Sequence, residues 1–185
     1  MDWLHNNCFR EILLIEGQLE NQKVDLARMP DFSLDAAFMA YVGATENMAL
    51  SKRLSAGDSL AAMERLGLTC DAADAGLLVA RYDADEDGRL SYWEFANMFL
   101  PGEPKLRKEL SARKATPMSE QTYSRFKAML RAVLNAEAMS ENLRQKLQAN
   151  VSATLRELFD RLDCATRGFL TQIELVTFFS AFPII

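Results

Sequence analysis

The chain has 185 residues, 49% of them hydrophobic and 25% charged, with a formal net charge of −5. This composition is typical of one or two small globular domains and argues against a nucleic-acid partner. A single histidine, His5, and three scattered cysteines argue against a Cys/His metal cluster and a Ser/His/Asp triad, so we expect no enzymatic activity. No apolar run approaches the roughly 18 residues of a membrane span, and scattered thiols suit a reducing compartment, so we expect a cytoplasmic protein without a membrane partner.

The first 28 residues predict an amphipathic helix that ends before Pro30. Its apolar face is formed by Leu4, Cys8, Ile12, Ile15, Leu19 and Leu26. Two interpretations of this N-terminal segment, residues 1–32, stay open. The helix either packs on the helix–loop–helix pair of its own chain that follows it or docks on a partner.

Residues 33–68 predict two helices, 33–42 with Ser33 as N-cap and 59–68, joined by a loop. A calcium loop of the helix–loop–helix kind has twelve positions, with ligands at 1, 3, 5, 7, 9 and 12 and glycine at 6. Counted back from the second helix, the loop runs from Asn47 to Asp58, with Leu54 at position 8, Ala49 and Ser51 at 3 and 5, and Lys52 at 6. Counted from the first helix, position 1 falls on Val42. Neither frame predicts calcium binding.

The segment "RYDADEDGRLSYWEF", residues 81–95, does match the calcium pattern. Counted from Asp83, Gly88 falls at position 6, where the chain turns with positive φ, and Leu90 falls at position 8, the apolar position that pairs with a neighbouring loop. The predicted metal ligands are Asp83, Asp85, Asp87, Arg89 through its backbone carbonyl, Ser91 directly or through water, and Glu94 with two oxygens. We expect one Ca²⁺ here, and Mg²⁺ in the resting loop stays open. The alternative is an acidic turn without an ion.

A helix capped by Thr69 or Asp71 precedes this loop, and a second helix after it is stopped by Pro101, which predicts a domain boundary. Residues 1–102 carry 17 acidic and 8 basic side chains, a net −9, whereas residues 103–185 carry 9 and 13, a net +4. The basic half begins with "KLRKELSARK", residues 105–114. This stretch is either a solvated helix face or a contact for an acidic surface such as a tubulin tail. We expect residues 101–118 to form a basic linker.

Residues 119–185 predict a helical lobe with one helix from a Ser119 cap and another from a Ser140 cap. Its last loop, residues 163–174, keeps the twelve-position frame. Asp163, Gly168, Leu170, Thr171 and Glu174 stand at positions 1, 6, 8, 9 and 12. Positions 3 and 5 are Ala165 and Arg167, so two carboxylates are missing and we expect no useful calcium binding.

These segments resemble the EF-hand superfamily over residues 33–100 and, less fully, over residues 152–180. The resemblance implies an all-α fold: an EF-hand pair with an extra N-terminal helix and a helical C-terminal lobe. More narrowly, the chain is similar to protist EF-hand proteins of the ciliary and cortical cytoskeleton. The segments that carry this likeness are "IEGQLENQKVDLARMPDFSLDAAF", "RYDADEDGRLSYWEFANMFLPGEP" and "LRQKL".

The leading hypothesis is a non-enzymatic calcium-binding structural or adaptor protein of a cytoskeletal assembly, with a ciliary axoneme as one such assembly and tubulin or a target helix as partner. The alternative is a calmodulin-like calcium-sensing light chain or regulatory subunit that wraps a target helix. A regulatory subunit of a phosphatase is disfavoured because residue 2 is Asp2, which cannot be N-myristoylated. One site in 20.8 kDa makes a poor calcium buffer.

Overall fold

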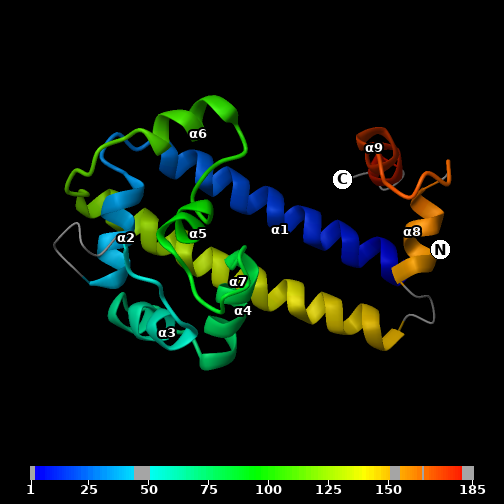
Figure 1. The fold of residues 1–185 in the computed structure, drawn as a ribbon, viewed down its shortest axis with the longest axis horizontal. Coiled ribbons are helices and arrows are strands. Elements are labelled where there is room, and N and C mark those ends of the chain that lie inside the picture. The colour runs from blue at the N-terminus through cyan, green and yellow to red at the C-terminus, as the bar shows by residue number, and fades with distance from the viewer. Residues whose placement is uncertain (1–2, 44–50, 151–154, 164, 181–185) are drawn as a thin grey trace. The chain divides into compact units, whose positions relative to one another are not determined.

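The computed structural model describes residues 3–43, 51–150, 155–163 and 165–180, and every regular element in these ranges is a helix (Figure 1). The all-α prediction is therefore confirmed. The helices are α1 (Trp3–Ala27), α2 (Leu34–Val42), α3 (Ala56–Arg65), α4 (Ala72–Tyr82), α5 (Tyr92–Asn97), α6 (Pro104–Ser111), α7 (Glu120–Asn150), α8 (Leu155–Leu162) and α9 (Gln172–Ser180). Within the described ranges, no helix is long and apolar enough to cross a bilayer.

Internal contacts divide the chain into two units. The central unit is Ile15–Met139, and the terminal unit combines Met1–Leu14 with Ser140–Ile185. The packing therefore does not divide at the boundary predicted after residue 100. In the central unit, α2, α3, α4 and α5 form one cluster, coloured cyan to green in Figure 1.

Capping side chains set where several helices begin. Ser33 Oγ accepts a hydrogen bond from Ala36 N, as the sequence predicted, and Ser119 Oγ accepts one from Thr122 N at the start of α7. Of the two caps considered for α4, the structure uses Asp71, which accepts from Asp74 N. The predicted cap at Ser140 is wrong, because this residue is buried within the continuous helix α7. The strong helix formers Ala, Glu and Met precede it, and neither Gly nor Pro interrupts the helix.

An aromatic cluster fills the core of the central unit. Phe95 on α5 lies at its middle, with ring centroids 5.1 Å from Phe38, 4.9 Å from Tyr41 and 5.0 Å from Phe99. Phe99 extends the cluster to Phe126 on α7 at 5.5 Å. Aromatic pairs at such distances contribute about 0.5–1.5 kcal/mol each beyond their burial. The short helix α5 is therefore anchored from both sides, although it has only six residues.

Residues 15–27 of α1 pack on their own chain. Ile15, Leu19 and Leu26 are buried within the central unit, where the helix runs beside α7 (Figure 1). Arg81 on α4 forms ion pairs with Glu16 on α1 and with the buried Glu137 on α7. Residues 15–27 therefore lie against α7, which is outside the predicted helix–loop–helix pair, and contact that pair through Arg81. The side chain of Leu4 lies outside the described residues.

The segment predicted as a linker, residues 101–118, contains α6 and is tied to the end of α1. The Arg113 guanidinium donates hydrogen bonds to the carbonyl oxygens of Met29, Phe32 and Ala27 at 2.6, 2.7 and 3.0 Å. Leu110, which belongs to α6, is buried. These contacts explain why this segment belongs to the central unit rather than separating two domains.

Candidate metal centre

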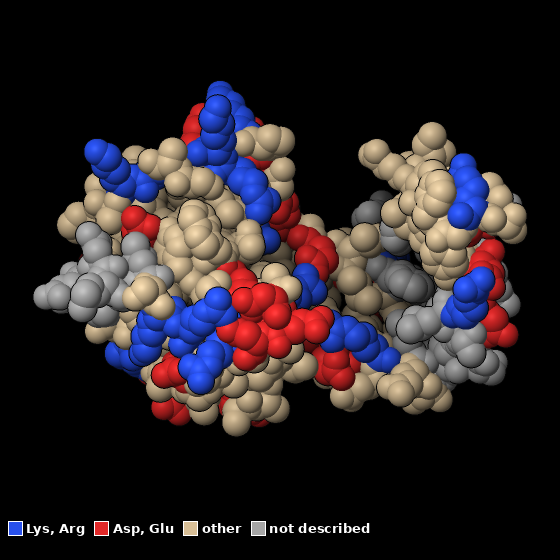
Figure 2. Space-filling model, in the orientation of Figure 1, with Lys and Arg blue, Asp and Glu red and all other residues tan. Residues whose placement is uncertain are grey.

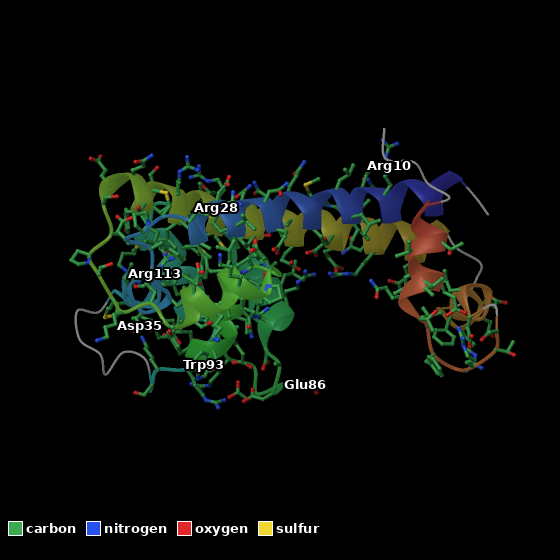
Figure 3. The ribbon with its side chains drawn as sticks, turned by 90° about the horizontal axis from the view of Figure 1, so that it is seen from above. Arg10, Arg28, Asp35, Glu86, Trp93 and Arg113 are labelled. Atoms are coloured by element: carbon green, nitrogen blue, oxygen red, sulfur yellow. The ribbon has the colours of Figure 1, made fainter. Side chains whose placement is uncertain are left out.

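The loop between α4 and α5 has the backbone of a tight acidic turn. Asp83 follows the last residue of α4, and Ser91 is the N-cap of α5. Two residues between them have positive φ, Glu86 at 57° and Gly88 at 76°. Glycine adopts this conformation at little cost, which explains why the turn needs Gly88. Figure 3 shows Glu86 at the outer end of the loop, on the side of the central unit away from α1 and α7.

Three predicted ligands meet in this loop. Carboxylate oxygens of Asp83, Asp85 and Asp87 lie within 4.8 Å of one another, the half-buried Asp83 beside two exposed residues. The Asp83 carboxylate also accepts hydrogen bonds from Asp87 N at 3.1 Å and Gly88 N at 2.7 Å. The backbone thus fixes the first carboxylate, and the others converge on it. Three like charges this close repel one another unless a cation offsets them.

Glu94 is not part of this aspartate triad. Its Oε1 accepts from the backbone nitrogens of Ala84 (2.8 Å) and Asp85 (3.4 Å), and its Oε2 accepts from the nitrogen (2.8 Å) and hydroxyl (2.7 Å) of Ser91. Burial alone would raise the pKa of Glu94, but these hydrogen bonds outweigh it and lower the pKa. The side chain is 6% exposed. Glu94 therefore closes the loop by holding its beginning to its end.

The other two predicted ligands lie on either side of Leu90. The Arg89 nitrogen donates to Asp87 Oδ1 at 2.9 Å, and the Arg89 side chain is exposed, as expected for a position that would bind metal through its carbonyl. Ser91 is paired with Glu94 rather than with the aspartates. Of the six predicted ligands, three carboxylates are therefore together, while Ser91 and Glu94 form a separate hydrogen-bonded pair.

The preceding loop contributes a residue that the sequence prediction missed. Leu54 and Leu90 form an antiparallel bridge, with N···O distances of 2.9 and 2.8 Å. Next to this bridge, Arg53 Nη1 lies 3.1 Å from Asp85 Oδ2 and also pairs with Asp87 Oδ2. The available signal was the frame that put Leu54 at position 8 opposite Leu90, since it also brings residue 53 to the acidic loop. In Figure 2, basic side chains lie against the red acidic cluster near the centre of the view.

The described part of the first loop agrees with the frame counted from Asn47, rather than the one from Val42. Ser55 and Asp58, at positions 9 and 12 of that frame, form the same reciprocal pair as Ser91 and Glu94. Ser51 and Lys52 are exposed. Asn47 and Ala49 lie outside the described residues, so the structure does not bear on their predicted failure to bind calcium.

The C-terminal loop repeats the hydrogen bonds of the acidic loop. Asp163 accepts from Arg167 N at 2.9 Å and Gly168 N at 2.6 Å, and Thr171 pairs with Glu174. Thr166 and Gly168 have positive φ at 51° and 81°, the same two positions as in the acidic loop. Here, however, Arg167 Nη2 lies 2.8 Å from Glu174 Oε1. Position 5, which has an acidic ligand in a calcium loop, is here the arginine of an ion pair within the loop.

The donor set at the acidic loop fits a hard cation. Calcium and magnesium prefer carboxylate and carbonyl oxygens, and the triad supplies three anionic ones. Comparisons with protein-family models, with curated proteins and with solved structures find no match for this chain.

Proposed function

We propose that this protein is a non-enzymatic calcium-binding protein of the EF-hand type, with a structural or adaptor role and one functional loop at residues 83–94. The observation that carries the proposal is the convergence of the Asp83, Asp85 and Asp87 carboxylates in a loop between two helices. A donor set of this chemistry suits Ca²⁺, and suits Mg²⁺ in resting conditions.

The residues that would hold Ca²⁺ come from every ligand position of the loop. They are Asp83, Asp85 and Asp87 through carboxylates, Arg89 through its backbone carbonyl, Ser91 directly or through water, and Glu94 through both carboxylate oxygens. The bound ion supplies positive charge that offsets the repulsion among the carboxylates. Glu94 would have to leave Ala84 and Asp85 to become a ligand. Because it lies in the first turn of α5, such a change alters how the loop holds that helix.

The first loop supports this proposal as the silent member of a pair. The Leu54–Leu90 bridge and the matching Ser55–Asp58 and Ser91–Glu94 pairs give the two loops one register. A silent partner that stabilises an active loop explains why residues 33–68 keep the frame although positions 1, 3 and 5 have no acidic residue.

We infer a cytoskeletal location, such as a ciliary axoneme, from the likeness to protist ciliary EF-hand proteins. The proposed partner is a protein, either tubulin or a target helix. The exposed basic residues of α6, Lys105, Arg107 and Lys108, support an acidic partner surface (Figure 2).

A calcium-sensing light chain or regulatory subunit is the second candidate, and the hydrogen bonds of Glu94 favour it. A ligand that must exchange several hydrogen bonds for metal coordination couples binding to rearrangement. A purely structural site would not need this exchange. The two candidates differ in the size of the structural response to calcium.

Calorimetric titration of calcium into the full chain, with excess magnesium, tests the proposal. We expect about one ion per chain, no measurable binding to the Glu94→Gln variant, and unchanged binding to the matched Glu174→Gln variant in the C-terminal loop. Trp93, which is 64% exposed and precedes Glu94, reports the response by fluorescence in a Trp3→Phe background. A large change indicates a sensor and a small one a structural ion. Absence of binding to the wild-type chain would rule out the calcium function.

A further inference from the structure

Arg53 brings a positive charge from one loop onto the aspartates of the next. Its guanidinium pairs with Asp85 and with Asp87, which are 32 and 34 residues further along the chain. The neighbouring residue Leu54 is fixed to Leu90 by two backbone hydrogen bonds and is 1% exposed. The pairing of the two loops therefore places Arg53 beside the aspartates. Its ion pairs join residues that are far apart in the sequence.

The C-terminal loop contains a similar arrangement within itself. Arg167 occupies position 5, where a calcium loop has an acidic ligand, and its guanidinium pairs with Glu174 at position 12. The guanidinium carbon also lies 5.4 Å from the centroid of the Phe169 ring, which helps to hold the side chain in place. In both loops, then, an arginine is ion-paired with carboxylates of the ligand frame.

We propose that Arg53 is a built-in counter-cation of the aspartate triad, which holds the metal-free loop together and competes with a divalent cation for Asp85 and Asp87. This inference rests on the proposed function and specifies how the same site is regulated. The guanidinium pairs with the carboxylates of Asp85 and Asp87, and the ion would use the same two carboxylates, so the two cations compete for them. Arg53 thereby weakens calcium binding and stabilises the metal-free protein.

The exposure of the groups makes Arg53 a displaceable cation. The side chains of Arg53, Asp85 and Asp87 are 48%, 51% and 31% exposed, and ion pairs this accessible to water are weak. The Arg167–Glu174 pair differs, because Glu174 is only 14% exposed and the loop has no carboxylates at positions 3 and 5 to attract a metal. A metal ion can therefore displace the Arg53 pair, whereas the C-terminal loop offers a metal too few carboxylates to displace Arg167.

The test compares calcium affinities of the full-length wild type, Arg53→Gln and Lys52→Gln by calorimetry. The control removes the same charge one residue away, where Lys52 pairs with Asp58 at 3.9 Å instead of with the triad. We expect R53Q to bind calcium roughly two- to fivefold more tightly than wild type, the range that exposed ion pairs give. K52Q should differ from wild type by less than half as much. Equal affinities for R53Q and wild type, or equal gains in both variants, would overturn the inference while leaving the calcium function intact.

A second measurement needs no calcium. In excess chelator, the thermal stabilities of wild type, R53Q, Asp87→Asn and the double variant form a cycle that reports the coupling between Arg53 and Asp87. We expect a favourable coupling between the two residues in chelator. A coupling of zero in chelator would overturn the pair itself. If neither wild type nor R53Q binds calcium, the proposed function fails, and the competition fails with it. The cycle in chelator still reports, independently of calcium, whether Arg53 and Asp87 form an ion pair.

Discussion

Asp31 connects the segment after α1 to the start of α7 through a set of short hydrogen bonds. Its Oδ1 accepts from Thr122 Oγ1 at 2.6 Å, and its Oδ2 accepts from Ser119 N at 2.7 Å. The hydrogen bond from Thr122, followed by those from Ser119, lowers the pKa of Asp31 to about 2. A single carboxylate thus holds both the N-cap residue and the first turn of the long helix α7.

This low pKa predicts a specific pH dependence of stability. A carboxyl whose pKa is lower in the folded state stabilises the protein above its unfolded pKa of about 3.9, and this contribution is lost as the pH falls through about 2. Wild type should therefore melt at a higher temperature than Asp31→Asn above pH 4, and the difference should shrink towards pH 2. Thermal melts across this range measure it, with Asp25→Asn, an exposed aspartate on α1, as the control. A difference that does not vary with pH would contradict this role of the charge.

At the scale of elements, the Leu54–Leu90 bridge joins the loop before α3 to the loop before α5, so that the two loops pack together. Both side chains are buried, at 1% and 0% exposure. We expect Leu54→Ala and Leu90→Ala each to cost about 2–5 kcal/mol of unfolding free energy, and the half-buried Leu77→Ala on α4 to cost less. In urea unfolding with chelator present, the double variant should depart from additivity by more than about 0.5 kcal/mol, because the two side chains share one environment. Additive losses would mean that the loops are stabilised independently.

Local signals predicted most of these elements, and non-local contacts account for what was missed. Ser33, Ser119 and the glycine at 88 act through neighbours a few residues away, so the sequence predicted them. The cap predicted at Ser140 is wrong because tertiary packing, which buries this residue, overrides the local preference of serine for a helix start.

In the candidate site, the same limit applies. The spacing of the aspartates predicted their convergence, but the ligand spacing of a metal-bound loop says nothing about where Glu94 lies without metal. Its hydrogen bonds to the backbone of Ala84 and Asp85 depend on how the loop folds back on α5, which the spacing does not specify. Arg53 was missed because its partners are more than 30 residues away and become neighbours only through the pairing of the loops.

At the scale of the whole molecule, charge is separated along the chain. The acidic residues concentrate before residue 103, whereas residues 103–185 have a net charge of +4. Contacts such as those of Arg113 hold the segment of α6 in the same unit as the acidic loop. The central unit therefore presents both an acidic loop and a basic helix, and the two surfaces can serve different ligands.

The basic helix predicts binding to microtubules through the acidic tubulin tails. Lys105 and Lys108 are exposed on α6, whereas Leu110 of the same helix is buried. The two lysines can therefore contact a partner while the helix stays folded. The full chain should sediment with microtubules in low salt and less so as salt rises, because exposed charges are screened. The Lys105→Gln/Lys108→Gln variant should bind several-fold more weakly. The control, Arg28→Gln/Arg131→Gln, removes the same charge from exposed positions on other segments and should bind as wild type does.

Microtubules from which the acidic tails have been cleaved separate this contact from others. Loss of wild-type binding on cleaved microtubules, together with the defect of the α6 variant on intact ones, assigns the contact to lysine side chains and tubulin tails. Equal binding of both double variants on intact microtubules would mean that the basic residues of α6 form a solvated face. In that case we expect the partner to bind at the helices that flank the acidic loop, and the target-helix alternative becomes the better hypothesis for this protein.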